Sequence, residues 1–278
     1  MRKAFTMIVS GVAACLLISG TTTLATEPAR VATNAPVVAP AEHPLAPVLR
    51  WAEQARPGIA AIRDYTATLQ KQERIDGRLM PSQILEVKVR HEPFSVHTRF
   101  VFPQDVAGQQ AIFVEGRNNG NLLGRGVGVE ALLGWVPLDP EGPIAMRGQK
   151  YPITQIGVLN LVDELLKVGR EAIRIEGAGT EVLYFENQTL GTGDSARQVT
   201  EIRVINPVRR PGLTFHVARI FVDNELNLPI RYQAFDWPSA PGETPQLIEI
   251  YHYGDLKTNV GLTDADFDSS NPRYNSRR

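Results

Sequence analysis

The chain between residues 64 and 253 repeats apolar and polar positions with the period of two that is typical of β-strands. The alternation is clearest over 84–90, where Leu85, Val87 and Val89 are apolar and Glu86 and Lys88 lie between them. A strand of this kind has one buried and one solvated face, as in an antiparallel sheet. On this basis we predict strands over 65–75, 84–90, 94–102, 111–115, 122–126, 181–187, 198–206, 214–222, 229–236 and 246–253.

Short turn sequences connect several of these predicted strands. Asp76-Gly77 is a strong signal for a two-residue hairpin. Residues 117–120 (Arg-Asn-Asn-Gly) and 223–225 (Asp-Asn-Glu) connect two further pairs of predicted strands. Because antiparallel neighbours need only such short connections, the pattern predicts an antiparallel meander.

Two segments have the helical period instead. The first is 47–63, in which we expect Pro57 to break the helix. The second runs from Thr154, a plausible N-cap, to Val168, and Gly169 is expected to end it. Its polar residues gather in one arc of about 100°, and most of the remaining circumference is apolar. Such a helix must be nearly surrounded by other protein or by an apolar ligand.

The simplest way to pack these elements is a curved antiparallel sheet with the apolar helix inside its concave face. We therefore predict a mainly β (α+β) fold, a single half-open β-barrel or strongly curved sheet wrapped around helices, over residues 48–274. Residues 26–47 hold five prolines and few large apolar side chains, which predicts a semi-extended tether. Residues 275–278 are expected to form a polar tail.

The first 25 residues have the pattern of a bacterial secretory signal peptide. Arg2 and Lys3 precede an apolar run, and small residues up to Ala25 have the usual spacing of a cleavage site. At about 15 residues the apolar run is shorter than the roughly 20 residues that a transmembrane helix needs. We therefore expect an exported protein of the periplasm or cell envelope, peripheral to the membrane. An alternative remains, because residues 12–15 (Val-Ala-Ala-Cys) resemble a lipobox that would make Cys15 a lipid anchor.

Composition narrows the classes of function. The 278 residues are 43% hydrophobic and 21% charged, an ordinary globular composition that excludes collagen-like, coiled-coil and wholly disordered chains. A formal net charge of −1 argues against a nucleic-acid binder. Cys15 is the only cysteine, so a chain cleaved after Ala25 would be stabilised by core burial rather than by disulfides.

Patterns for metal or catalytic chemistry are weak in this sequence. The five histidines lack the spacing of metal ligands, and we expect His97 to lie on a solvated strand face with Ser95 and Arg99. The sequence lacks the Gly-x-Ser-x-Gly motif of serine hydrolases and a glycine-rich dinucleotide motif. We therefore expect neither enzymatic activity nor a cofactor, although a hydrolase with an unrecognised carboxylate site stays a third alternative.

Three aspartates near the C-terminus, at 264, 266 and 268, resemble the start of a calcium loop. Ser269 and Asn275 replace the glycine and glutamate that an EF-hand requires, so the pattern fails. The simpler interpretation is a C-terminal turn that fixes Leu262 and Phe267 against the sheet.

Apolar strand and helix faces are the remaining candidates for a site. Both the predicted sheet face and most of the second helix require apolar partners, so together they either line a cavity or fill a core. The residues that we predict to line an apolar cavity are Phe94, Val96, Phe100, Phe102, Phe113, Trp135, Leu159, Val162 and Leu166.

Several short stretches are characteristic in their order along the chain. They are 64–66 (Asp-Tyr-Thr), 72–77 (Gln-Glu-Arg-Ile-Asp-Gly), 88–90, 93–96 (Pro-Phe-Ser-Val), 151–154 (Tyr-Pro-Ile-Thr), 228–232 (Leu-Pro-Ile-Arg-Tyr), 259–264 and 266–268. Together they resemble an uncharacterised family of secreted bacterial proteins, a domain of unknown function. That resemblance implies no activity.

More loosely, the order of helix, hairpins, mid-chain helix and late strands is similar to the periplasmic lipoprotein carriers and receptors of the LolA/LolB type. This resemblance implies a half-open barrel, closed by helices, that holds acyl chains in an apolar cavity. It also implies a functional arginine, for which Arg90 is the nearest positional candidate and would form a polar rim.

These observations predict a non-catalytic envelope protein that binds a lipid, a lipoprotein acyl chain or another apolar ligand in its concave face. Its partner would be a lipid or an acylated protein. The alternative is a sensor or interaction module that binds another envelope protein and fills the cavity with its own side chains. An open cavity favours the first hypothesis, and a filled one favours the second.

Overall fold

The computed structural model describes residues 42–275. The signal peptide predicted over 1–25, most of the predicted tether and residues 276–278 lie outside the described residues. The folded domain begins earlier than the predicted residue 48, because Leu45 is already buried in the core and the first helix starts at Ala46.

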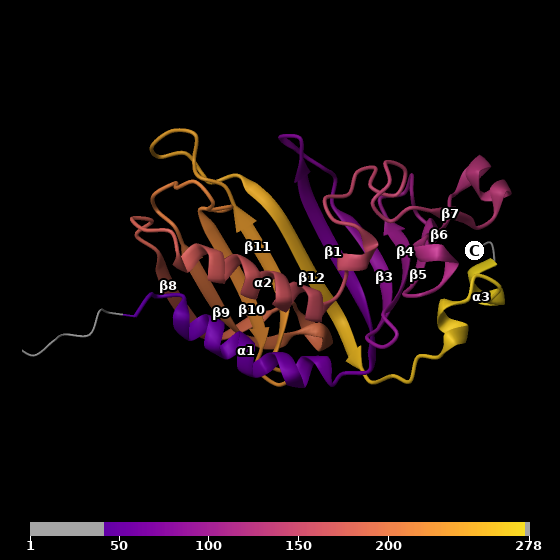
Figure 1. Cartoon of the computed structure of the whole chain (residues 1–278), viewed down its shortest axis with the longest axis horizontal. Coiled ribbons are helices and arrows are strands. Elements are labelled where there is room, and N and C mark those ends of the chain that lie inside the picture. Colours follow the sequence, from indigo (N-terminus) through magenta and orange to yellow (C-terminus); the bar gives the residue numbers. More distant parts are fainter. Residues whose placement is uncertain (1–41, 276–278) are drawn as a thin grey trace, which may run out of the picture. The chain divides into compact units, whose positions relative to one another are not determined.

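The described strands form one antiparallel sheet of twelve strands (Figure 1). They are β1 (Asp64–Ile75), β2 (Arg78–Leu79), β3 (Gln83–Arg90), β4 (Ser95–Phe102), β5 (Gln110–Val114), β6 (Leu122–Arg125), β7 (Val136–Leu138), β8 (Glu181–Leu190), β9 (Arg197–Ile205), β10 (Val217–Asp223), β11 (Leu228–Phe235) and β12 (Leu247–Thr258). Their order across the sheet is β7-β6-β5-β4-β3-β1-β12-β11-β10-β9-β8, with β2 paired to β1. The predicted mainly β, antiparallel fold is confirmed.

Helices make up a smaller part of the described chain than strands do. They are α1 (Ala46–Ala60), α2 (Val158–Ile173) and α3 (Pro272–Asn275), with 3-10 turns η1 (Asn118–Gly120), η2 (Gly128–Leu133), η3 (Ile153–Gln155), η4 (Gly193–Ser195) and η5 (Asp264–Phe267). Figure 1 shows α1 and α2 crossing one face of the half-sheet β8–β12. Apolar residues of β9, β10 and β11 pack against both helices there, so this face is the concave, core-forming one.

Helix α1 differs from its prediction, because Pro57 lies inside it and the helix continues to Ala60. Proline removes one backbone donor, but near the end of a helix few further hydrogen bonds depend on it. The carbonyl of Pro57 still accepts a hydrogen bond of 3.0 Å from the N–H of Ala61. The buried face also continues past Pro57 to Ile59, so packing extends the helix beyond the expected break.

Helix α2 was predicted over Thr154–Val168 but runs from Val158 to Ile173, so both predicted ends are wrong. Residues 153–155 form η3 instead, and Gly157, with φ +134°, separates that turn from the helix. Gly169 lies inside the helix. A Cβ at this position would stand 2.6 Å from Cδ2 of Leu49, so the glycine permits α1 and α2 to approach closely.

Two tyrosine hydroxyls hold the first turn of α2 against the centre of the sheet. The hydroxyl of Tyr65 on β1 accepts a hydrogen bond of 3.0 Å from the N–H of Val158. The hydroxyl of Tyr253 on β12 accepts one of 3.0 Å from the N–H of Gly157. These N–H groups have no partner inside the helix, so the sheet satisfies them. Burial raises the pKa of Tyr253 to about 12 and that of Tyr65 well above its usual value.

The opposite, convex face was expected to be solvated at Ser95, His97 and Arg99, and this is wrong for the first two. Ser95 and His97 are buried, because the C-terminal segment 259–275 covers them. The imidazole of His97 stacks on Tyr274 with ring centroids 4.1 Å apart, and its Nε2 is 3.0 Å from Oε1 of Gln110.

The C-terminal segment is held by ion pairs and by apolar contacts. Asp264 pairs with Arg90 at 2.7 Å and with Arg117 at 2.8 Å, and Asp266 pairs with Lys88 at 2.7 Å. Phe267 is buried with apolar residues of β5, and Leu262 packs beside it. The predicted C-terminal turn that fixes Leu262 and Phe267 against the sheet is therefore confirmed.

Candidate functional site

The concave face contains a cavity of about 1620 Å³. Ordinary small-molecule pockets measure about 300–1,000 Å³, so this cavity is large. Its walls come from both halves of the sheet, from α1 and α2, and from the connection 139–157 that crosses the concave face. Most of the lining is apolar. On the β1–β7 half it includes Leu69, Leu85, Phe100, Ala111, Leu122 and Leu138, and on the β9–β12 half Val204, Ala218, Ile220 and Ala234.

Among the residues predicted to line a cavity, Phe100 lies in its wall. Most of the others lie in the adjoining core. Val96, Phe113, Val162 and Leu166 are buried there, and Phe94 and Leu159 pack against that core. One side of helix α2 is therefore buried in this core, whereas Leu161, Leu165 and Val168 on another side of the same helix line the cavity.

Three predicted residues lie away from the concave face. Phe102 is 46% exposed, because an extra residue in β4 shifts the register so that Leu85 pairs with Phe100 and Ile84 pairs with Phe102. Trp135 packs with Tyr274 in the convex-face cluster. Arg90, the polar-rim candidate, contacts Asp264 and Ser95 at the convex face.

A buried polar cluster at the β1–β12 pair was not predicted from the sequence. Its members are Lys71 and Glu73 of β1, Glu249 and Tyr251 of β12, and Gln149, Lys150 and Tyr151 of the crossing connection. In the sheet register Lys71 lies opposite Tyr251 and Glu73 opposite Glu249, so the strand residues are direct neighbours. The sequence did contain a signal. Residues 65, 67 and 69 form the buried face of β1, and the period of two places 71 and 73 on that same face.

Glu73 is the most connected member of this cluster. Its Oε2 accepts hydrogen bonds from Nζ of Lys71 at 3.1 Å and from the backbone N–H of Lys150 at 3.0 Å. Its Oε1 accepts one from the hydroxyl of Tyr251 at 2.5 Å. Lys71 also donates to Oε1 of Gln149. The charged side chains of Lys71 and Glu73 are both buried, and they form an ion pair with each other.

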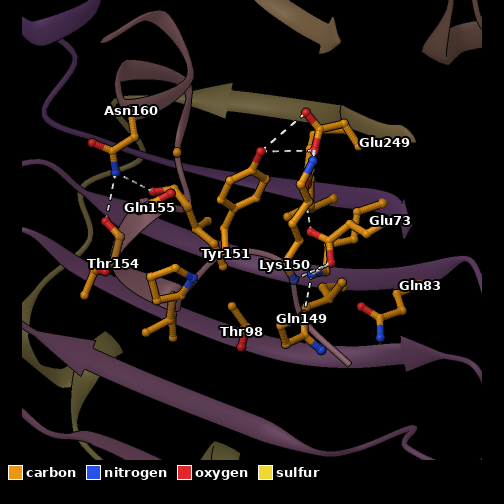
Figure 2. A pocket seen from close by; sticks show the side chains of 18 of the residues that line it. Glu73, Gln83, Thr98, Gln149, Lys150, Tyr151, Thr154, Gln155, Asn160 and Glu249 are labelled. Atoms are coloured by element: carbon orange, nitrogen blue, oxygen red, sulfur yellow. Dashed lines mark hydrogen bonds and ion pairs between the residues drawn. The ribbon is translucent and has the colours of Figure 1, made fainter. Parts of the chain in front are cut away.

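Glu249 holds the second ion pair. Nζ of Lys150 pairs with its Oε2, and the hydroxyl of Tyr151 donates to the same oxygen at 3.2 Å (Figure 2). Burial lowers the pKa of Lys71, although the Glu73 carboxylate opposes this effect. Burial, with the neighbouring carboxylates, raises the pKa values of Tyr151 and Tyr251, so both hydroxyls stay protonated as donors.

An exposed apolar rim borders the cavity. It consists of Val129, Leu132 and Leu133 of η2, which are 82%, 80% and 74% exposed, and Ile144, which is 61% exposed. Val129, Leu133 and Ile144 also line the cavity, so the apolar wall continues to the surface at this rim. Large apolar side chains gathered at a surface mark a binding site or a route into one.

Other kinds of site have no support in the part of the chain that the structure describes. No three of its His, Asp or Glu side chains are grouped as ligands for a metal ion. None of the helices over 42–275 has both the length and the apolar character of a membrane span. Fold and site together define a cavity protein, an antiparallel sheet whose concave face holds an apolar space with a buried polar cluster in its wall.

The chain belongs to the family described as "Protein of unknown function (DUF1571)", whose model matches residues 62–276. The resemblance to a domain of unknown function is thereby confirmed. A comparison with curated proteins found no match.

The chain is also similar to several solved structures. One is a putative outer membrane lipoprotein-sorting protein domain from Vibrio parahaemolyticus, with 11% identity, TM-score 0.37, and coverage of 79% of this chain and 95% of that one. Another is the lipoprotein LppX from Mycobacterium tuberculosis, with 12% identity, TM-score 0.40, and coverage of 80% and 98%. A LolA superfamily protein from Nitrosomonas europaea has 10% identity, TM-score 0.29, and coverage of 78% and 97%. All three TM-scores lie below 0.5.

Proposed function

We propose that this protein binds an apolar or amphipathic ligand, such as the acyl chains of a lipid or an acylated protein, and catalyses no reaction on it. The observation that supports this function is the cavity of about 1620 Å³, which is lined mainly by apolar side chains and reaches the surface at the apolar rim. Burial of each CH₂ group contributes about 0.8 kcal/mol, so an enclosed acyl chain gains on the order of several kcal/mol. Burial of this size is sufficient for reversible binding.

Two features favour this function over the alternatives. A sensor module with a self-filled cavity would leave little space on the concave face, whereas this space is large. A carboxylate hydrolase needs an acid whose oxygens can reach a substrate. In the buried cluster, Glu73 and Glu249 are each engaged by a lysine and a tyrosine hydroxyl.

The proposed site of action is the periplasm or cell envelope. The signal-peptide pattern that ends at Ala25 supports export, and a lipid on Cys15 is the alternative mode of attachment. Acyl chains are abundant in that compartment as lipids and lipidated proteins, and they match the apolar lining.

The test is to purify the mature protein from its native envelope and to record native mass spectra before and after organic extraction. Uptake of the neutral fluorescent probe N-phenyl-1-naphthylamine is measured on the extracted protein. We expect a co-purifying lipid or acylated peptide, and saturable probe binding.

The matched variants are Ala111→Trp and Ala60→Trp. Ala111 lines the cavity on β5, so an indole ring there occupies space that the ligand needs. Ala60 is exposed at the end of α1 and outside the lining, so it controls for the added ring. We expect Ala111→Trp to weaken probe binding at least tenfold and Ala60→Trp to leave it unchanged. A wild-type protein with a clean apo mass and no uptake would contradict the proposed function.

A further inference from the structure

We infer that the polar end of the ligand is uncharged, a hydroxyl, ester or amide group, and that Gln83 and Gln149 bind it. This inference rests on the proposed function and deepens it, because it names the chemical class of the ligand. Free fatty acids, anionic phospholipids and alkyl ammonium ions would then be poor ligands of the same cavity.

The first argument is that the buried charges already neutralise one another. Lys71 is paired with Glu73, and Lys150 is paired with Glu249. A ligand carboxylate or phosphate would have to displace a glutamate from its lysine or be buried without a counter-ion. Both are unfavourable, because a buried charge keeps its desolvation penalty when its partner is removed. A ligand ammonium group meets the same difficulty with the glutamates.

The second argument concerns the cavity wall as a whole. The lining contains five Lys and Arg side chains and six Asp and Glu side chains, so it has no positive excess that would attract an anion. Outside the buried cluster, Glu164 pairs with Lys167, and Asp163 pairs with Arg56 of α1. A site for an anionic headgroup would instead have an excess of cations with hydrogen-bonding capacity to spare.

The third argument is that uncharged polar groups in the wall have hydrogen-bonding capacity left over. Gln83 lines the cavity, is half-buried and lies opposite Lys71 in the register, and its amide has no hydrogen-bond partner among residues 42–275. Figure 2 shows the Gln83 side chain without an interaction line, near Glu73. An amide at the cavity wall with donors and an acceptor to spare can form hydrogen bonds with a ligand, so a ligand that supplies partners gains affinity.

Gln149 completes this set of neutral groups. Its Oε1 accepts the hydrogen bond from Lys71, which leaves its Nε2 as a donor toward the cavity. Amides and hydroxyls both donate and accept, as do the hydroxyls and esters of neutral lipids. The apolar wall starts directly beside these groups. Leu85 follows Gln83 at i+2 on the same face of β3, and Phe100 pairs with Leu85 on β4, so an acyl chain attached to the headgroup continues along them.

The experiment compares three ligands that share a fourteen-carbon chain and differ in their polar end: 1-monomyristoylglycerol, myristate and tetradecylamine. A chain of this length spans about half the thickness of a bilayer. Each displaces N-phenyl-1-naphthylamine from the extracted protein at pH 7.5. We expect the monoglyceride to bind about tenfold or more tightly than either ion, the size of effect that one buried hydrogen bond or unpaired charge produces. Equal or tighter binding of myristate or the amine would overturn this inference and leave the proposed function standing. If the extracted wild-type protein does not bind the probe at all, the proposed function fails as well.

Two variants test the assigned groups. Glu249→Gln leaves Lys150 without its counter-ion, so we expect myristate to bind about tenfold more tightly than to the wild type. Glu53→Gln removes the same charge from an ion pair with Arg170, away from the lining, and should leave all three affinities unchanged.

Gln83→Leu keeps the approximate size of the side chain and removes its amide. The variant leaves the ion pairs Lys71–Glu73 and Lys150–Glu249 unchanged. We expect about a tenfold loss for the monoglyceride and no loss for myristate. Equal losses for both ligands, or no loss for either, would overturn the assignment of the headgroup site.

Discussion

Individual polar side chains in this protein are buried wherever another segment covers the sheet. On the concave face the connection 149–151 covers Lys71 and Glu73, and on the convex face the C-terminal segment covers His97. Burial lowers the pKa of His97 to about 4, the hydrogen bond with Gln110 opposes this shift, and the nearby cation of Lys88 adds to it. The imidazole of His97 is therefore neutral at pH 7, and it stacks on the phenol ring of Tyr274.

We predict that His97 makes stability depend on pH between about 6.5 and 4. In this range the unfolded chain binds a proton that the native imidazole does not, so the native state loses stability as the pH falls. The loss reaches roughly 3 kcal/mol at pH 4. Urea unfolding of the wild type and of His97→Gln at pH 7.5, 5.5 and 4.5 measures it. The other titrating groups are common to both proteins, so parallel curves of stability against pH would contradict this prediction.

The helices owe their positions to a few contacts rather than to capping residues in the sequence. Helix α2 begins where two sheet tyrosines accept its free N–H groups, and it passes Gly169 because α1 packs there. Gly58 of α1 is also helical, but a Cβ at that position would meet nothing within 4 Å. The same residue type therefore has a packing role in one helix and none in the other.

This difference predicts opposite effects of alanine in the two helices. Gly58→Ala should raise the free energy of unfolding by about 0.5–1 kcal/mol, because alanine loses less backbone entropy in a helix. Gly169→Ala has the same intrinsic gain, but its methyl group overlaps the side chain of Leu49, and overpacking costs typically about 1–3 kcal/mol. We expect a net loss of stability there. Chemical denaturation of both variants measures the difference, and equal gains would show that the helix contact is not close.

The whole domain is arranged around the pair β1–β12, the first and last long strands. Two meanders, β3–β7 and β8–β11, flank this pair, and the connection from β7 to β8 crosses the concave face between them. That connection supplies Ile144 of the apolar rim, residues 149–151 of the buried cluster, and helix α2. Access to the cavity thus depends on one covering segment and on η2 before it.

Leu133 of the apolar rim should control the rate of ligand entry more than stability. Because it is 74% exposed and also lines the cavity, Leu133→Asp should change the free energy of unfolding by less than about 0.5 kcal/mol. A charge at the entrance should slow probe uptake several-fold in stopped-flow fluorescence. Val260→Asp replaces an exposed apolar residue outside the lining and is the control. Equal uptake rates for the two variants would contradict this route.

Local sequence patterns predicted the strands well, because period-two alternation is a property of each strand by itself. The hairpin at Asp76-Gly77 formed as expected, with φ of 49° and 77° at the two residues. The side-chain face of Leu85, Val87 and Val89 was also correct. The site was harder to predict. The extra residue in β4 that exposes Phe102 exists only relative to the partner strand, so no single-strand pattern indicates it.

The sequence by itself determined the class of fold, an antiparallel sheet with an apolar helix, because short-range periodicity and turn chemistry are sufficient for that. Only the tertiary structure decided which apolar residues fill the core and which line a space. That choice depends on how far the helices and the crossing connection stand from the sheet, a distance set by contacts such as the hydrogen bonds from the start of α2 to Tyr65 and Tyr253. The buried cluster around Glu73 and Glu249 likewise exists only because β1 and β12, far apart in sequence, are neighbours in the sheet.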